Sequence, residues 1–265
     1  MKPILIAGPC QHQSYDHSMM IADHCAKIAG KYGFDYVFKA SYDKANRSSD
    51  GSMRGQGLAK TMDDFWAMKA NMNGLRILTD VHTNSQVRTI AGMHGDCVDI
   101  LQIPAFLCRQ TDLVKEACAT GKIVNIKKGQ FLAPWDMKGI LSKTKDAKEV
   151  WITERGTSFG YNNLIVDFTG LQYMLDNFPD RRVILDATHS VQKPGGNGQT
   201  SGGNRDYVPR LAYAAAATGI RSFFLEVHDD PDNAPSDGPN SLRLENFETV
   251  VKQIAKIMEI TNGSN

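Results

Sequence analysis

Cationic side chains are concentrated in one segment of the chain and recur at isolated later positions. The segment 38–49 holds two lysines, one arginine and three serines, and the later cations are Arg109, Lys127, Lys128 and Arg155. An ammonium group offers phosphate a point charge, whereas a guanidinium offers a planar fork that binds it bidentately. A solvated surface would explain any single cation, but it explains less well why Lys127 and Arg155 end apolar runs. The pattern therefore favours anionic substrates that carry one or two phosphates.

Four residues of metal-ligating type lie near the two ends of the chain. They are Cys10, His189, Glu226 and Asp237. One thiolate, one imidazole and two carboxylates form a mixed donor set suited to zinc, iron, manganese or cobalt. Taken singly, a cysteine after an apolar run is usually a small buried hydrophobe, and a histidine near a serine is usually just hydrogen-bonded. The four can form a metal site only if the fold brings the two ends of the chain together.

The segment 195–203 is rich in glycine. It matches neither G-x-G-x-x-G nor G-x-x-x-x-G-K-[ST], so it does not indicate a nucleotide-binding loop. We expect a flap over an active site. A plain surface loop is the alternative that composition leaves open.

Short apolar runs alternate with helix-like stretches along the whole chain. The expected strands are 4–7, 36–39, 76–79, 98–102, 123–127, 150–153, 183–186 and 222–226, and the expected helices are 18–32, 57–72, 84–93, 111–120, 135–144, 167–177, 205–218 and 243–260. Near-continuous apolar strands separated by helices indicate a parallel sheet covered by helices. Eight such units predict an α/β fold, a single-domain (β/α)8 TIM barrel over residues 1–265, which suits a fold of about 250 residues. An open doubly wound sheet is the alternative.

Polar or ionisable side chains end or follow each expected strand. They include Cys10, Lys39, Asp80, Gln102, Lys127, Arg155, His189 and Glu226. The carboxyl ends of the strands form the active-site face of such barrels, so these residues would converge on one mouth. An open sheet would gather only those near its switch point.

Charge and cysteine content exclude several classes of protein. Lys+Arg number 30 and Asp+Glu 29, so no strong overall field favours nucleic acid or a membrane. The apolar run 4–7 is shorter than the roughly 7–15 residues of a signal-peptide core. No stretch approaches the roughly 18 apolar residues that span a bilayer. The five cysteines include no C-x-x-C pair, which indicates reduced thiols in a cytoplasmic protein.

Long motifs between Ile4 and about Ile260 resemble one enzyme family. They lie at 7–10, 38–49, 79–82, 102–112, 125–131, 154–156, 159–164, 186–192, 201–203 and 236–239, and include Asp186-Ala187-Thr188-His189-Ser190. Together they resemble 3-deoxy-D-manno-octulosonate 8-phosphate synthase. Members of this family that work without metal carry Asn where this chain has Cys10, so the resemblance is to the metal-dependent class.

The resemblance implies a homotetramer that condenses phosphoenolpyruvate with arabinose 5-phosphate in lipopolysaccharide biosynthesis. It implies that the carboxylate and phosphate of phosphoenolpyruvate are held by Lys44, Lys127 and Arg155. The residues implied for arabinose 5-phosphate are Asn46, Arg47 and Ser48, with Arg109 reaching its phosphate from a neighbouring subunit.

The resemblance also assigns the remaining site residues. Lys39, Asp80 and Gln102 would line the mouth, and the catalytic residues would be Lys44, Asp80, Lys127 and His189. A divalent zinc, iron, manganese or cobalt ion would be held by Cys10, His189, Glu226 and Asp237.

Two other functions remain open. A heptulosonate 7-phosphate synthase uses erythrose 4-phosphate on the same fold, but its substrate loop typically reads Lys-Pro-Arg-Thr, where this chain has Lys44-Ala45-Asn46-Arg47-Ser48-Ser49. A non-catalytic phosphosugar-binding barrel is the second, although simple binding would not need all four expected metal ligands.

Overall fold

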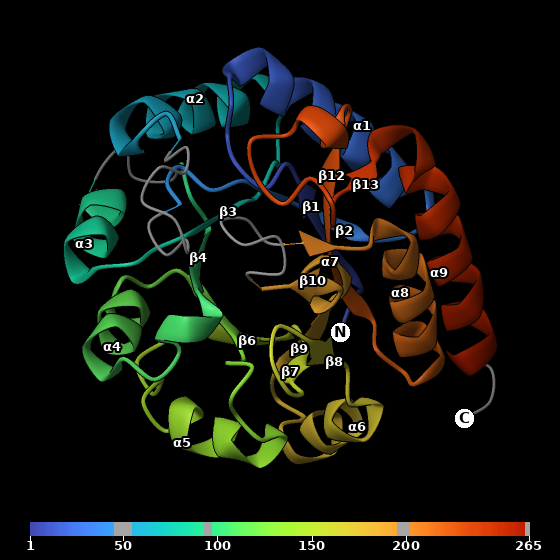
Figure 1. The fold of residues 1–265 in the computed structure, drawn as a ribbon. Helices are drawn as coiled ribbons and strands as arrows, with labels where there is room; N and C mark the ends of the chain where they lie inside the picture. The colour runs from blue at the N-terminus through green and yellow to red at the C-terminus, as the bar shows by residue number, and fades with distance from the viewer. Residues whose placement is uncertain (45–54, 93–96, 195–201, 263–265) are drawn as a thin grey trace.

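Parallel strands pair edge to edge in the order of the chain until the last closes on the first. The computed structural model describes residues 1–44, 55–92, 97–194 and 202–262. Within these residues the barrel consists of β1 (Ile4–Gly8), β2 (Asp35–Lys39), β3 (Ile77–Asp80), β4 (Ile100–Ile103), β5 (Ile123–Lys127), β6 (Glu149–Glu154), β9 (Arg182–Asp186) and β12 (Ser222–His228). Because β12 pairs in parallel with β1, the sheet closes, as Figure 1 shows. The predicted (β/α)8 barrel is confirmed, and the open sheet is excluded.

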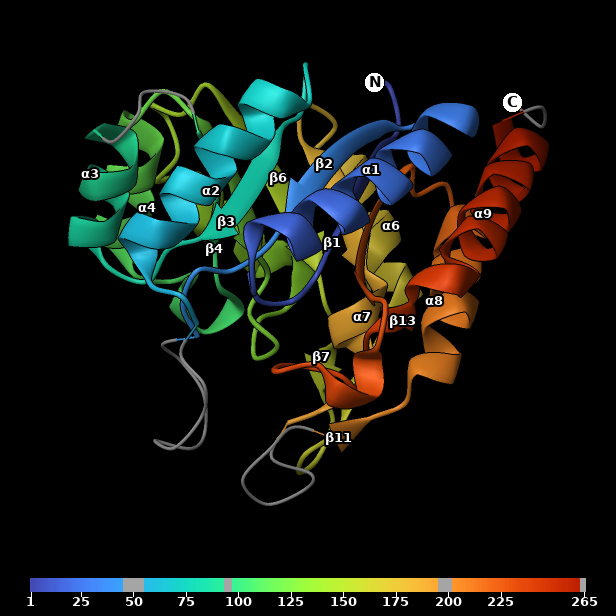
Figure 2. The same ribbon diagram turned by 90° about the horizontal axis from the view of Figure 1, so that it is seen from above.

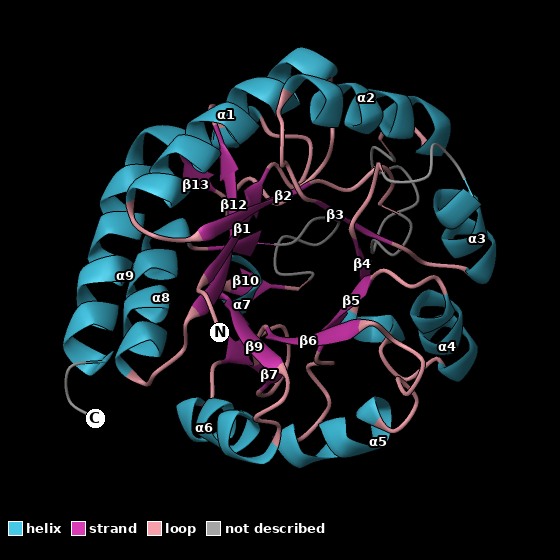
Figure 3. Cartoon of the chain, turned by 180° about the vertical axis from the view of Figure 1, so that it is seen from behind, coloured by secondary structure: helices cyan, strands magenta, loops and turns pink. Residues whose placement is uncertain are grey.

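Helices cover the outside of the barrel (Figure 3). They are α1 (Tyr15–Lys31), α2 (Leu58–Asn71), α3 (Asn84–Gly92), α4 (Thr111–Ala119), α5 (Met137–Leu141), α6 (Phe168–Asn177), α8 (Val208–Ala217) and α9 (Phe247–Asn262). In α1, Ser14 caps the first turn by accepting from the backbone N–H of His17. Its buried residues Ile21, Cys25 and Ile28 recur at helical spacing, so one face packs on the sheet.

Short elements follow the barrel strands, and apart from the 3-10 turns within the expected helices 135–144, 205–218 and 243–260 they were not predicted. The two-residue strands are β7 (Thr157–Ser158), β8 (Leu164–Ile165), β10 (Gln192–Lys193), β11 (Gly202–Gly203) and β13 (Leu242–Arg243), and α7 spans Ala187–Ser190. The 3-10 turns are η1 (Ala105–Leu107), η2 (Pro134–Asp136), η3 (Arg205–Tyr207), η4 (Pro231–Asn233) and η5 (Leu244–Asn246). Such elements are too short to show a hydrophobic period. Figure 2 shows β7, β11 and α7 at the end of the barrel away from both termini.

The barrel interior has two layers. Its apolar layer is a separate buried cluster of Ile4, Ile6, Val37, Leu78, Ile100, Trp151, Ile184 and Phe224. Its polar layer lies at the carboxyl ends of the strands and contains Lys39, Asp80, Gln102, Lys127, Asp186 and Glu226, all buried. Side chains alternate across a strand, so the inward positions recur every second residue. The larger core fills the space between the barrel and its helices.

One close approach near the mouth requires glycine. A Cβ on Gly8 would lie 2.1 Å from the backbone oxygen of Lys39. Any side chain there would push β1 and β2 apart at the point where Lys39 enters the barrel. No helix among the described residues is long and apolar enough to cross a bilayer.

Candidate active site

A cavity of about 450 Å³ opens at the carboxyl ends of the strands. The predicted site residues that line it are Lys39, Lys44, Asp80, Gln102, Lys127, Arg155, His189 and Asp237. They come from β2, β3, β4, β5, β6, β9 and β12 or the segments that follow these strands. Barrel closure therefore brings together side chains that the sequence separates by up to about two hundred positions, as expected for this fold.

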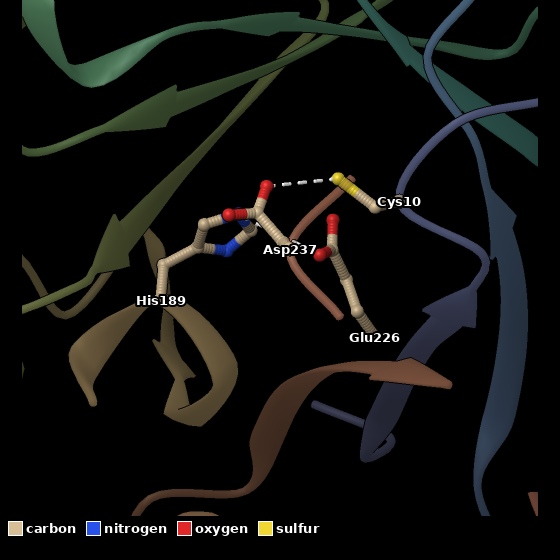
Figure 4. Close-up of side chains that lie close together, drawn as sticks. All are labelled: Cys10, His189, Glu226 and Asp237. Atoms are coloured by element: carbon tan, nitrogen blue, oxygen red, sulfur yellow. Dashed lines mark hydrogen bonds and ion pairs between the residues drawn. The ribbon is translucent and has the colours of Figure 1, made fainter. Parts of the chain in front are cut away.

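Cys10, His189, Glu226 and Asp237 converge at one side of this cavity (Figure 4). One ligand atom from each lies within 4.8 Å of the others. Cys10 Sγ is 3.1 Å from Asp237 Oδ2, and His189 Nε2 is 3.7 Å from Glu226 Oε2. Cys10 and Glu226 do not line the cavity themselves, but both are buried against residues that do.

Two properties of this cluster suit a divalent cation. Among the described residues, Glu226 Oε2 has no hydrogen-bond partner although it is buried. Burial, and then the neighbouring Glu226 carboxylate, raises the pKa of the Cys10 thiol to about 12. The Glu226 oxygen is thus an acceptor that a metal could use, and the buried, negatively charged surroundings that disfavour the Cys10 thiolate are ones that a bound cation would offset.

Asp186 orients His189 within this cluster. Its Oδ2 accepts from His189 Nδ1 at 2.7 Å, and its Oδ1 accepts from the His189 backbone N–H at 2.9 Å. Because Nδ1 faces Asp186, Nε2 is left toward Glu226, which is the arrangement that fixes the tautomer of a ligating histidine.

Asp186 also binds Lys127. The Lys127 ammonium donates to Asp186 Oδ2 and lies 3.2 Å from His189 Nδ1. Burial would raise the pKa of Asp186, but His189 and Lys127 outweigh it and hold that pKa far below its usual range. Burial lowers the pKa of Lys127, and the nearby cations Lys39 and Arg155 add to this effect. The site thus contains a permanent carboxylate shared between two cavity residues.

Lys39 belongs to the metal-ligand side of the cavity. Its ammonium donates to Glu226 Oε1 at 2.8 Å and to the Cys10 carbonyl at 3.2 Å. Burial alone would lower the pKa of Lys39, but Glu226, Cys10 and Asp80 raise it on balance. Lys39 therefore stays charged and binds one oxygen of Glu226, while the other oxygen has no hydrogen-bond partner among the described residues.

Arg155 also brings its guanidinium to the cavity. One terminal nitrogen donates to Gln192 Oε1 at 2.6 Å and to the His189 carbonyl at 3.2 Å. Its Nε is buried and has no acceptor among the described residues. Lys44, also at the cavity, donates a 2.8 Å bond from its ammonium to Ser41 Oγ. The buried Nε of Arg155 is a donor with spare capacity, which is suited to an anionic ligand.

Asp80 forms an acidic patch on the cavity wall. Its Oδ2 lies 3.2 Å from His82 Nε2. Burial would raise the pKa of Asp80, but His82 and the lysines Lys44 and Lys39 hold it well below the usual value. Asp80 is therefore an ionised acceptor, suited to a sugar hydroxyl rather than to a phosphate.

Three predicted substrate residues fall in a part of the chain that the structure does not describe, and one predicted cation does not line the cavity. Asn46, Arg47 and Ser48 fall outside the described residues. Arg109 is exposed and does not line the cavity of a single chain.

Lys128, one of the cations that favoured anionic substrates in the sequence, does not line the cavity. Lys128 is fully buried behind the cavity wall, where it pairs with Glu154 at 3.3 Å. Adjacent residues of an extended chain face opposite sides, so Lys127 and Lys128 cannot both enter the barrel.

Several cavity residues were not predicted. They are Ser41, Gln130, Gln192, Arg205 and Ser236. Ser236 Oγ lies 3.1 Å from Cys10 Sγ, and Gln192 Nε2 donates to Asp237 Oδ1 at 2.9 Å. Gln192 and Ser236 lie in the motifs at 186–192 and 236–239, but uncharged side chains gave no chemical signal of their own.

Comparisons with known proteins agree with this geometry. Residues 1–262 match the model of the DAHP synthetase I family. The chain belongs to the DAHP synthetase I family. It is 51% identical over 260 residues to a protein of Rickettsia bellii named 2-dehydro-3-deoxyphosphooctonate aldolase, which covers 97% of this chain and 92% of that protein.

Relatives from other bacteria carry the same name. A Rhodopseudomonas palustris protein is 52% identical over 252 residues, which are 94% of this chain and 86% of the relative. A Bradyrhizobium diazoefficiens protein is 50% identical over 252 residues, 94% of this chain and 87% of the relative. The family match spans the whole barrel, including each strand end that supplies a cavity residue.

Proposed function

We propose that this enzyme condenses phosphoenolpyruvate with D-arabinose 5-phosphate and water, giving 3-deoxy-D-manno-octulosonate 8-phosphate and phosphate in lipopolysaccharide biosynthesis. The observation that carries this proposal is the match at about half identity, along nearly the whole chain, to proteins named 2-dehydro-3-deoxyphosphooctonate aldolase. The cavity supports it because Lys44, Lys127 and Arg155 bring three cations to one mouth.

The reaction makes one C–C bond and breaks one C–O bond. C3 of phosphoenolpyruvate attacks the aldehyde carbon of the open-chain pentose phosphate, and positive charge grows at C2. Water adds at C2 while one proton passes to the oxygen of the former aldehyde, and the tetrahedral intermediate then expels phosphate by C–O cleavage as its C2 hydroxyl gives up its proton and becomes the ketone. Lys127 and Arg155 stay fixed while these anions change, because Asp186 and Gln192 hold their donors in place. This is electrostatic stabilisation by groups already oriented for the reaction.

The alternative acceptor is erythrose 4-phosphate, as in a heptulosonate 7-phosphate synthase. The names of the relatives favour the five-carbon sugar. The test is to compare kcat/KM for the two acceptors with phosphoenolpyruvate saturating. A preference for the four-carbon sugar would reverse the assignment, and phosphate release without any sugar would argue against both.

We further propose that the cluster of Cys10, His189, Glu226 and Asp237 holds a divalent zinc, iron, manganese or cobalt ion. When bound, the ion would orient the aldehyde and polarise its oxygen. The donor set and the unpartnered Glu226 oxygen support this proposal. Chelation should remove one metal per subunit, measured by elemental analysis, and abolish turnover, and re-addition of one of these ions should restore both.

Cys10→Asn is the sharpest variant of the metal site. It removes the only sulfur ligand of the four, so the metal content should fall sharply. If the ion mainly orients the aldehyde, some chelator-resistant activity should appear, because an amide in that space can form a hydrogen bond instead. A native enzyme that keeps full activity in chelator would refute the metal proposal.

We also propose a homotetramer with shared sites that works in the cytoplasm. Exposed Arg109 lies outside its own cavity, and the exposed ring of Phe106 lines the same rim, which supports completion of the cavity by a second copy. The five cysteines are free and buried, which suits a reducing compartment. Mixed oligomers of Arg109→Ala and Lys127→Met subunits should recover activity, and no recovery despite proven subunit exchange would contradict shared sites.

A further inference from the structure

A buried ion pair lies directly behind the wall of the cavity that carries Lys127 and Arg155. Lys128 and Glu154 are the next residue after Lys127 and the residue before Arg155, and neither lines the cavity. Lys128 is fully buried and Glu154 is 3% exposed, and their charged groups lie 3.3 Å apart. Each charged residue that faces the cavity here is therefore joined in the chain to a charged residue that faces away from it.

The Lys128 side chain holds the segment that follows β5. Its ammonium donates to the Leu132 carbonyl at 3.0 Å and to Thr157 Oγ1 at 3.2 Å. The first bond closes the turn that carries Gln130, and the second joins this turn to the segment after β6. Lys128 therefore links two neighbouring loops of the barrel.

The Glu154 side chain holds the segment that follows β6. Its Oε1 accepts from the backbone N–H groups of Arg155 at 2.8 Å and Gly156 at 2.6 Å, while Oε2 faces Lys128. The backbone at Gly156 has φ 93°, a left-handed turn that glycine adopts readily. Glu154 therefore sets the direction in which the chain leaves β6, and with it the position from which Arg155 enters the cavity.

Stability alone does not explain this pair. Burying two charges costs desolvation free energy that their attraction often fails to recover, and an apolar pair of similar size is often as stable or more so. What an apolar pair could not do is accept two backbone N–H groups on one side and donate to a carbonyl and a hydroxyl on the other. The pair is thus better suited to fixing two loops relative to one another than to strengthening the core.

We propose that Lys128 and Glu154 are positioning residues that set the spacing of Lys127 and Arg155 and so determine the affinity for phosphoenolpyruvate. This rests on the proposed function, in which those two cations hold the phosphate and carboxylate of that substrate. The residues act only through the backbone they hold, so the effect of losing them falls on one substrate and not on both.

The test variant is the double substitution Lys128→Met with Glu154→Gln. It removes both charges together, so no lone charge is left buried, and the glutamine oxygen can still accept from Arg155 and Gly156. Because a misplacement of about 1 Å can cost up to a hundredfold, the KM for phosphoenolpyruvate should rise about tenfold while that for arabinose 5-phosphate stays within about twofold. Calorimetric binding of phosphoenolpyruvate should weaken by the same factor.

A matched control exists at the other end of the barrel. Asp99 there accepts from Lys69 Nζ at 2.8 Å and from the Ile77 backbone N–H at 2.8 Å, the same combination of lysine and backbone donors. Lys69→Met with Asp99→Asn should lower the melting temperature and leave both KM values unchanged. Equal rises in both KM values for the Lys128/Glu154 variant, or no rise in a folded protein, would overturn the positioning role.

A milder variant tests the same proposal if the double variant does not fold. Thr157→Val removes one acceptor of Lys128 without altering any charge, and the KM for phosphoenolpyruvate should rise about threefold, the effect of one weakened hydrogen bond. An unchanged KM in this folded variant would overturn the proposal. Wild-type turnover separates the two claims: no turnover with these substrates overturns the proposed function and the positioning role together, whereas normal turnover with unaffected variants overturns the positioning role alone.

Discussion

The two ends of the barrel interior are built by the same strands but hold opposite kinds of side chain. On five strands the inward residue changes from apolar to polar within a single step of two positions. The pairs are Val37 and Lys39, Leu78 and Asp80, Ile100 and Gln102, Ile184 and Asp186, and Phe224 and Glu226. The apolar layer, at the amino-terminal side, is therefore a hydrophobic core. The polar layer, at the carboxyl ends of the strands, holds buried polar and charged groups.

The residues that stabilise the fold and the residues that could act on substrate thus lie in different layers along the barrel axis. Burial of side chains in the apolar layer stabilises the fold, roughly in proportion to the area removed from water. The polar layer instead carries charges whose burial is costly unless they are paired. Lys39 is paired with Glu226, and Lys127 with Asp186, and both ammonium groups lie over the Phe224 ring, at 5.6 and 4.1 Å from its centroid. Substitutions in the two layers should thus affect different measurements.

The largest effect on kcat/KM should come from Lys127→Met in the polar layer. It removes a cavity cation and leaves the buried Asp186 carboxylate with His189 alone. Losing one preorganised group that stabilises developing charge costs about 10²–10³ in rate, so kcat/KM should fall by about a thousandfold. The control is Lys122→Met, just before the other end of β5, whose ammonium donates to the Val98 carbonyl far from the cavity. Comparable losses of activity in both variants would break the distinction between the two ends.

Ile184→Ala in the apolar layer should instead reduce stability and leave catalysis nearly unchanged. Ile184 is fully buried two residues before Asp186. Its truncation should lower the free energy of unfolding by about 3 kcal/mol through lost burial and a residual cavity. Urea unfolding at fixed protein concentration measures this, and kcat per folded active site should stay within about twofold of wild type. A large loss of kcat in the folded protein would mean that the layers are not independent.

Phe224→Leu at the boundary should give small effects on both sides. The Phe224 ring packs in the apolar layer and faces two ammonium groups of the polar layer. Losing a cation–π contact of about 1 kcal/mol should raise the KM for phosphoenolpyruvate about fivefold and reduce stability by a similar free energy. Steady-state kinetics together with urea unfolding would test this, and a change in only one of the two would move the boundary away from Phe224.

Sequence patterns predicted the barrel well because its strands carry a strong local signal. Each strand is a short, nearly continuous apolar run, and all eight expected strands lie within two residues of the observed ones. The same patterns indicated which residues end the strands, and most of the expected site residues do line the cavity. They missed β7, β8, β10, β11 and β13, because two-residue strands are defined by their partner and not by any period of their own.

The sequence by itself determined the alternation of strands and helices and the types of side chain placed at each strand end. Only the tertiary structure decided which of those charged groups pair with one another. Lys39 meets Glu226 across 187 positions and Lys127 meets Asp186 across 59, whereas Lys128, adjacent to Lys127, faces away from the cavity. Local patterning records which residues are buried, but the partner of a buried charge depends on which strands become neighbours when the barrel closes.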